Sequence, residues 1–163
     1  MDGERTTRLL DALRTFGANY TDLTGRFAAW LGLHHTDAAA LVEILYAEDQ
    51  GTPLTPTGLG GRLGLTSGAT TNLLNRLEKL GHVVRTREHT DRRVVTLRSS
   101  PAIEAPAREF FGPLAGHLGT LVARYSAEQL DLVEDFLDRL RDTMAAALAD
   151  PPPDRPGAHR ADP

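Results

Sequence analysis

Five arginines crowd one short stretch of this sequence, and they are Arg85, Arg87, Arg92, Arg93 and Arg98. The wider segment 62–98 has eight basic and three acidic residues, a net charge of +5, whereas the remainder of the chain carries −9. Arginine suits contact with anions because its guanidinium group is weakly hydrated and always charged. The segment therefore predicts a localised contact with a polyanion, the alternative being a charged hairpin that is merely solvated.

Few other groups in the sequence are arranged for chemistry. There is no cysteine, which excludes disulfides, thiolate metal sites and thiol redox switches, and the six histidines are too scattered to predict a metal site. The sequence contains no glycine-rich phosphate loop followed by lysine, no nucleophile elbow and no His-Glu-x-x-His motif. We therefore expect neither an enzyme nor a protein that holds a metal or a cofactor.

The composition is that of a water-soluble globular chain, with 163 residues of which 40% are hydrophobic. No run of about 18 apolar residues is present to span a membrane. The first residues, MDGERTTRLL, lack the basic-then-apolar layout of a secretory signal. We expect a cytoplasmic location and no membrane contact.

Apolar residues near the start of the chain recur at alternating spacings of three and four. They are Leu9, Leu13, Phe16, Tyr20, Leu23, Phe27 and Trp30. This heptad stripe predicts one long helix over residues 6–31 with a seam for another helix. Thr36 is expected to cap a second helix that buries Leu41, Ile44 and Leu45.

Two short helices joined by a tight turn are predicted between residues 55 and 81. Thr55 and Pro56 mark the start of the first helix, and Gly64 supplies the residue that ends it. Thr66 is expected to cap the second helix. The core-facing side of that helix is predicted to consist of Thr70, Leu73, Leu74, Leu77 and Leu80. Its small and polar residues then face largely the other way.

Two β-branched runs, HVVRTR and RVVTLR, flank the turn sequence EHTD and predict an antiparallel hairpin. Beyond Pro101 the apolar spacing again indicates helices, and SAEQ at 126–129 has the pattern of a capping box. The predicted fold is mainly α with a small β-hairpin wing. It is a winged helix-turn-helix domain flanked by long N- and C-terminal dimerisation helices.

Residues 54–98 resemble the winged-helix segment of the MarR family of bacterial transcription regulators. The resemblance is carried by LTPTGLGGRLGLTSGATTNLLNRLEKLGHVVR and, after the turn, by DRRVVTL, in which Asp91 and Arg93 match the family's Asp-x-Arg motif. The flanking helical regions also match, so the resemblance covers residues 6–147. The chain departs from the family in the dense glycines at 58, 60 and 61, and in LRSSP where Leu-Thr-x-x-Gly is common.

The resemblance implies a homodimer whose first and last helices interlock and place two recognition helices on a pseudo-palindromic operator in double-stranded DNA. The recognition-helix residues expected at the DNA are Ser67, Gly68, Ala69, Thr71, Asn72, Asn75 and Arg76. The polar ones among them have the alternative of forming a solvated face. Arg76 either contacts a phosphate or forms an ion pair within the domain.

The wing residues expected at the DNA are Arg85, Arg87, His89, Asp91, Arg92 and Arg93. Arg93 would enter the minor groove while Asp91 fixes the turn and orients it. Arg85 and Arg87 are expected on phosphates, which position a protein without specifying a sequence. Alternatively, Arg92 pairs with Glu88 or Asp91.

The junction of the first two helices is where family members commonly hold a small effector. By this resemblance Phe27, Trp30, His34 and His35 are candidate contacts for a small aromatic or lipophilic effector. Alternatively, the two aromatic residues are present because they belong to the heptad seam, and the two histidines have a structural role.

These expectations combine into a domain plan and a function. The plan has an N-terminal dimerisation helix at 1–35, a DNA-binding domain at 36–100, C-terminal dimerisation helices at 101–149 and a disordered tail at 150–163. The function is that of a sequence-specific DNA-binding transcription regulator, a repressor released from its operator by a small-molecule effector. The alternative is a winged-helix module that binds protein, which would have no need of the +5 charge.

Overall fold

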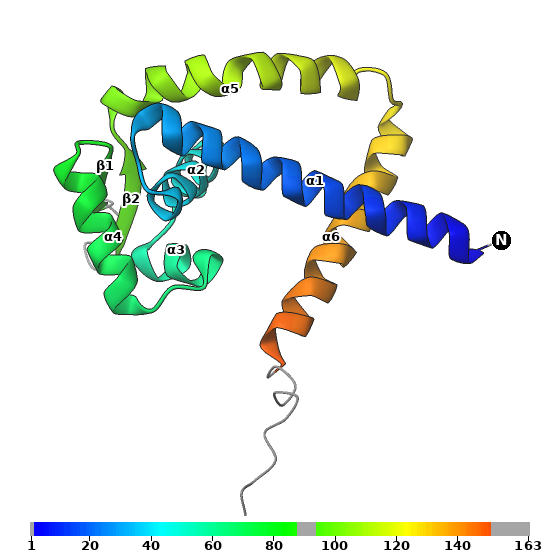
Figure 1. Cartoon of the computed structure of the whole chain (residues 1–163), viewed down its shortest axis with the longest axis horizontal. Helices are drawn as coiled ribbons and strands as arrows, with labels where there is room; N and C mark the ends of the chain where they lie inside the picture. Colours follow the sequence, from blue (N-terminus) through cyan, green and yellow to red (C-terminus); the bar gives the residue numbers. More distant parts are fainter. Residues whose placement is uncertain (1, 88–93, 151–163) are drawn as a thin grey trace, which may run out of the picture. The chain divides into compact units, whose positions relative to one another are not determined.

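The computed structural model describes residues 2–87 and 94–150, and its elements follow one another as Figure 1 shows. In chain order they are α1 (Asp2–Leu31), α2 (His35–Asp49), α3 (Pro56–Leu63), α4 (Ser67–Lys79), β1 (Val83–Arg87), β2 (Val95–Ser99), α5 (Pro101–Val122) and α6 (Ala127–Ala149). The chain divides into two compact units, Met1–Gly112 and Pro113–Pro163. Apart from Asp150, the tail predicted to be disordered lies outside the described residues.

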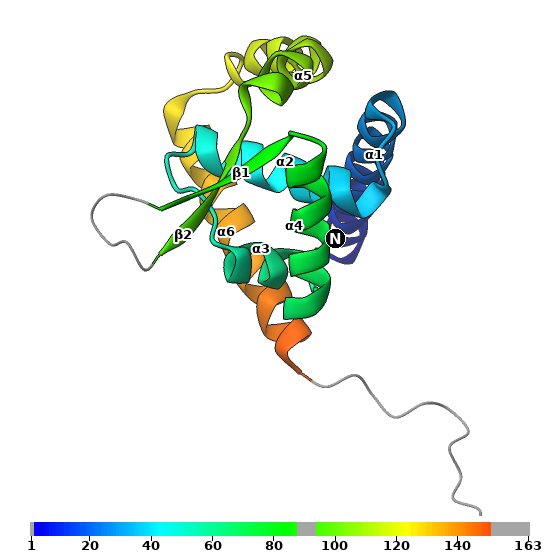
Figure 2. The same ribbon diagram turned by 90° about the vertical axis from the view of Figure 1, so that its left-hand side faces the viewer.

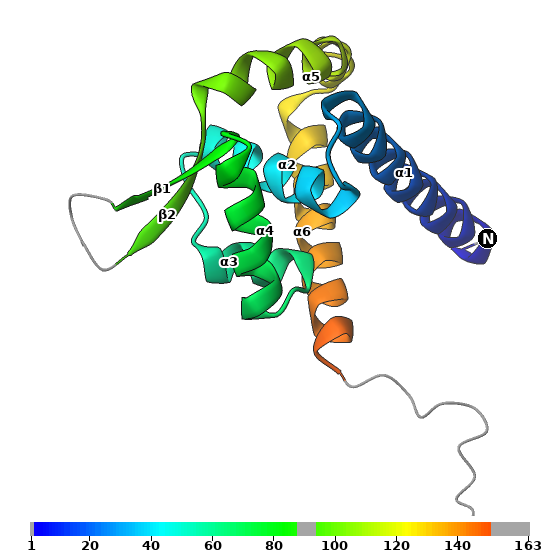
Figure 3. The same ribbon diagram turned by 60° about the vertical axis from the view of Figure 1, so that its left-hand side comes forward.

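The first unit contains a helix-turn-helix followed by a hairpin. Strands β1 and β2 pair antiparallel, from Val83 opposite Ser99 to Arg87 opposite Val95. Figures 2 and 3 show α3 and α4 next to each other, with the two strands projecting from the helices. The predicted fold class, mainly α with a small β-hairpin wing and long terminal helices, is confirmed.

The core of the first unit draws on every one of its elements. The largest fully buried apolar side chains are Phe27 of α1, Leu41 and Ile44 of α2, Leu59 of α3, Leu73, Leu74 and Leu77 of α4, Val83 of β1, Leu97 of β2 and Ile103 of α5. Complete burial of such a side chain stabilises the folded state by about 1.5–3 kcal/mol. Leu45 packs only partly against this core, and Leu80, which was predicted on the core-facing side, is 54% exposed.

The ends of α3 and α4 are set by the residues that the sequence indicated. The hydroxyl of Thr55 accepts a hydrogen bond from the Gly58 N–H at 3.1 Å, and the hydroxyl of Thr66 accepts one from Ala69 at 3.3 Å. Gly64 follows α3 with a φ of 64°, a left-handed conformation that glycine adopts without strain. Only Gly64, Leu65 and Thr66 separate the two helices, so the turn between them has little freedom.

The predicted start of α2 was wrong by two residues, because the N-cap is His34 and not Thr36. α1 ends at Leu31, after which Gly32 has a φ of 68° and the Leu33 N–H donates to the Ala28 carbonyl at 2.8 Å. This is a Schellman turn, and it leads directly into α2 at His35. His34 is the N-cap and its side chain makes no capping hydrogen bond, so Thr36 lies inside the helix rather than before it.

α3 and α4 approach each other closely at Gly60. A Cβ atom placed on Gly60 would lie 2.8 Å from the hydroxyl oxygen of Thr70, a residue that is 3% exposed. The Thr70 hydroxyl is itself fixed, because it donates to the Thr66 carbonyl at 2.9 Å. One of the glycines that departs from the family pattern is therefore required by helix packing.

Gly60→Ala should lower the free energy of unfolding by about 1–3 kcal/mol, because the added methyl group overpacks the contact with Thr70. Gly61→Ala is the matched control, since a Cβ there meets nothing within 4 Å and alanine favours the helix by about 0.5–1 kcal/mol. Urea unfolding of the two variants beside the parent measures both effects. Equal stability of the two variants would contradict the close approach.

Candidate nucleic-acid interface

α4 has one buried side and one polar, exposed side. Thr70, Leu73, Leu74 and Leu77 are buried in the core. The exposed residues include Ser67, Gly68, Ala69, Thr71, Asn72 and Asn75, all of which were predicted to face DNA. The Thr71 hydroxyl donates to the Ser67 carbonyl at 2.9 Å, so its oxygen can still accept a hydrogen bond. The structure thus brings six of the predicted recognition-helix residues to one surface.

Arg76 forms an ion pair within the first unit. Its Nε donates to Oδ2 of Asp37 at 3.1 Å and its Nη2 donates to Oδ1 at 2.6 Å. Asp37 is 2% exposed and lies in the first turn of α2. The hydrogen bond to Asp37 raises the pKa of Arg76. Of the two roles predicted for Arg76, the structure shows the ion pair, which ties α4 to α2.

Arg85 joins β1 to the last turns of α4. Its Nη1 lies 2.8 Å from Oε2 of Glu78, and its Nη2 donates to Oδ1 of Asn75 at 3.1 Å. The hairpin is thereby fixed against the helix that precedes it.

Two further contacts hold β2 in place. The Leu97 N–H donates to the Leu54 carbonyl at 2.7 Å, and the Ser99 N–H donates to Oε2 of Glu48 at 2.8 Å. Arg87 is exposed at the far end of β1. The predicted wing residues His89, Asp91, Arg92 and Arg93 lie outside the described residues.

The candidate effector residues fall in different environments. Phe27 is fully buried, and its ring centroid lies 5.1 Å from that of Phe110 and 4.7 Å from that of Phe111. Trp30 packs on the same rings but stays 48% exposed, and its centroid is 5.5 Å from that of Phe110. The environments of Phe27 and Trp30 are those of core and core-edge residues.

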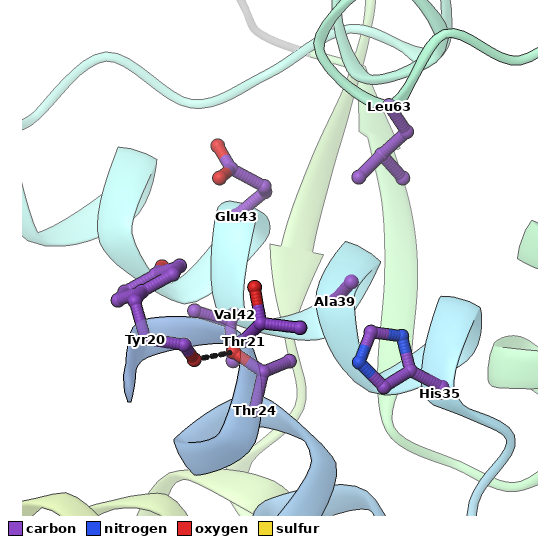
Figure 4. A pocket seen from close by; sticks show the side chains of 8 residues that line it. All are labelled: Tyr20, Thr21, Thr24, His35, Ala39, Val42, Glu43 and Leu63. Carbon is purple, nitrogen blue, oxygen red and sulfur yellow. Dashed lines mark hydrogen bonds between the residues drawn. The ribbon is translucent and has the colours of Figure 1, made fainter. Parts of the chain in front are cut away.

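Of the four candidate effector residues, only His35 lines the hollow between α1, α2 and α3 that Figure 4 shows. Its other lining residues are Tyr20, Thr21, Thr24, Ala39, Val42, Glu43 and Leu63. Burial, followed by the charge of Glu43, raises the pKa of Tyr20. Most of these residues could not be predicted from the sequence, because Tyr20 belongs to the heptad stripe and the others have the character of ordinary helix-surface residues.

His82 lies between α4 and β1. Its Nδ1 is buried and has no hydrogen-bond partner in the part of the chain that the structure describes. Burial lowers the pKa of His82 below its ordinary value of 6.5. Within residues 2–87 and 94–150 the structure places no group of three or more potential metal ligands together, and no helix is long and apolar enough to cross a membrane.

Two helices joined by a tight turn, with a polar face on the second and a hairpin fixed against it, define a winged helix-turn-helix protein. The model of the MarR family matches residues 31–94. The uncharacterized HTH-type transcriptional regulator YcgE of Bacillus subtilis (strain 168) is 34% identical over 118 residues, which are 72% of this chain and 74% of that protein. The chain therefore belongs to the MarR family of transcriptional regulators.

Solved structures share the fold. A MarR family protein from Bacillus stearothermophilus is 23% identical, with a TM-score of 0.58 over 89% of this chain and 99% of that one. A mutant of S. aureus MepR bound to an oligodeoxyribonucleotide is 18% identical, with a TM-score of 0.50 over 83% of this chain and 97% of that one.

The lowered pKa of His82 predicts a pH dependence of stability. Between its folded-state pKa and 6.5 the unfolded chain binds the proton and the folded chain does not, so stability falls as the pH falls through this window. His82→Gln removes this contribution. Urea unfolding at pH 7.5 and 5.5 should show a smaller loss of stability for the variant than for the parent. Identical losses would contradict the assignment.

Proposed function

We propose that this protein is a homodimeric repressor that binds an operator in double-stranded DNA and leaves it when a small molecule binds. The observation that carries the proposal is the exposed polar face of α4, which lies beside a hairpin in a segment of net charge +5. An α-helix fits the major groove of DNA, and short polar side chains on its outer face can reach base edges.

The predicted DNA-contact residues other than Arg76 and Arg85, which form ion pairs within the chain, each have a role in this proposal. Ser67, Gly68, Ala69, Thr71, Asn72 and Asn75 lie against the major groove, where the two smallest residues allow close approach of the helix backbone. Arg87, His89 and Arg92 contact the DNA backbone. Arg93 enters the adjacent minor groove and Asp91 orients it, as the family motif indicates. The DNA-binding domain spans residues 36–100, and the protein acts in the cytoplasm, where bacterial DNA lies.

The proposed dimer forms through the terminal helices, residues 1–35 and 101–149. α6 has 23 residues and buries none of them, although its apolar residues follow a heptad spacing. Those residues are Leu130, Val133, Leu137, Leu140 and Met144. On α1 the exposed fraction is 43% for Leu9 and 68% for Phe16. Long helices with an exposed apolar stripe are stabilised when a second helix covers the stripe.

The effector site is proposed in the hollow between α1, α2 and α3 that His35 lines. This hollow brings together residues of the N-terminal helix and of the DNA-binding domain, so an occupant can favour one arrangement of the two over another. A compound that prefers the arrangement in which the recognition helices no longer match the operator shifts the population toward free protein. Tyr20, Val42 and Leu63 supply apolar surface for a small aromatic or lipophilic compound.

DNA binding is tested by selecting bound fragments from the source genome and titrating them in mobility-shift assays. Asn72→Ala should weaken binding to the selected site by about 1–3 kcal/mol, while Asn19→Ala on α1 is the matched control and should leave it unchanged. The logarithm of the affinity should fall linearly with the logarithm of the salt concentration. Addition of aromatic or lipophilic compounds to the same titration identifies an effector by release of the fragment.

The proposal would be overturned if no fragment were selected and if the remaining affinity of the protein for DNA did not change with salt concentration. That outcome would favour the protein-binding module.

The dimer is tested by light scattering. We expect a mass of twice the 17.7 kDa of one chain. Leu137→Glu places a charge in the apolar stripe of α6 and should shift the mass toward that of one chain, whereas Asp135→Ala on the same helix should not. A parent mass of 17.7 kDa would show that the terminal helices do not associate.

A further inference from the structure

Three side chains form a small polar cluster between α4 and β1: Asn75, Glu78 and Arg85. The side chains of Arg85 and Glu78 are 31% and 30% exposed, so the pair is partly withdrawn from solvent. The distance from Arg85 Nη1 to Glu78 Oε2 is 2.8 Å, and the cluster carries no net charge. Arg85 therefore offers much less positive charge to a phosphate than an unpaired arginine at the same place.

The same guanidinium group sets the orientation of the Asn75 amide. A guanidinium only donates hydrogen bonds, so the amide oxygen Oδ1 must face it, and the Nη2 to Oδ1 distance is 3.1 Å. The amide nitrogen Nδ2 is the other end of the same planar group. It is the end that points away from Arg85, and its two N–H groups are donors.

Asn75 lies on the outer face of α4 that the proposed function places against the major groove. Gly68, Asn72 and Asn75 are spaced by four and three residues, which puts them in one row along the helix. All three are exposed. The N–H groups of Asn75 are therefore presented along the same row as the Asn72 side chain.

We propose, on the basis of the proposed function, that Arg85 is a positioning residue which makes Asn75 specific for a hydrogen-bond acceptor on a base edge. Guanine presents two acceptors in the major groove, N7 and O6, and its edge matches the donors of Asn75. Adenine is usually bound by asparagine through both amide ends, with the oxygen accepting from N6. In that geometry Oδ1 must accept from N6 in addition to Arg85, which already occupies one of its two lone pairs and turns the oxygen toward β1. Arg85 thus contributes to base preference and not to phosphate binding.

The test compares Arg85 with Arg87, which lies two residues further on β1 and makes no ion pair with any residue that the structure describes. Each base pair of the selected DNA site is substituted in turn, and affinities are measured over a range of salt concentrations. Arg87→Gln should weaken binding to all sequences alike and reduce the salt slope by about one.

Arg85→Gln combined with Glu78→Gln removes the pair without leaving an unpaired carboxylate beside the DNA. This double variant should keep the parent's salt slope but lose a preference of about tenfold for guanine over adenine at one position of the site. Asn75→Asp retains an acceptor for Arg85 but has no donor, so it should lose the same preference. Its circular dichroism and melting curve confirm that the variant is folded.

A reduced salt slope for the double variant, with an unchanged base preference, would show that Arg85 is a phosphate contact and would overturn this inference alone. A parent protein that selects no DNA would overturn the proposed function and this inference together.

Discussion

A buried carboxylate near the start of α2 fixes the position of α4, the helix on which the proposed DNA-binding surface depends. Asp37 is 2% exposed and receives two hydrogen bonds from Arg76. A carboxylate in such a place destabilises the fold unless a cation and well-aligned donors accompany it. The position and rotation of α4 are therefore constrained by the need to bring Arg76 to Asp37. Arg85 constrains the same helix from the hairpin, through Glu78 and Asn75.

Ion pairs of this kind neutralise part of the positive charge that the sequence concentrates in residues 62–98. Four of the six basic residues that the structure describes in that segment lie close to acids, in the pairs Arg62–Glu43, Arg76–Asp37, Arg85–Glu78 and Arg98–Glu48. Three of the four acids belong to α2. Part of the charge separation along the chain is thus cancelled when the chain folds. Among the described residues, Lys79 and Arg87 are the members of the segment that no such pair includes.

Local signals in the sequence were sufficient for the helix-turn-helix itself. Thr55, Gly64 and Thr66 act through hydrogen bonds and dihedral angles within a few residues, so their roles can be read from the sequence. The partners of Arg76 and Arg85 could not be predicted in the same way. Arg76 and Asp37 are 39 residues apart, and only the tertiary fold brings them together.

The start of α2 was mispredicted because threonine is a residue type that is common at N-caps. The Schellman turn at Gly32 determines where the helix begins. The effector candidates show a related limit. Phe27 and Trp30 belong to a heptad stripe, and the stripe does not determine which of its members enter the core of the chain. Tyr20, on the same stripe, lines the hollow instead. A periodic pattern identifies a face of a helix, but the neighbours of that face are a property of the whole fold.

The contacts that hold β2 also protect the sheet from unwanted association. A two-stranded sheet has outer edges whose N–H and C=O groups can pair with a strand from another molecule. On β2 the Leu97 N–H is occupied by the Leu54 carbonyl and the Ser99 N–H by the Glu48 carboxylate. At these two positions the edge offers no donor to an incoming strand, so a strand from a second copy of the protein cannot accept a hydrogen bond from the edge there.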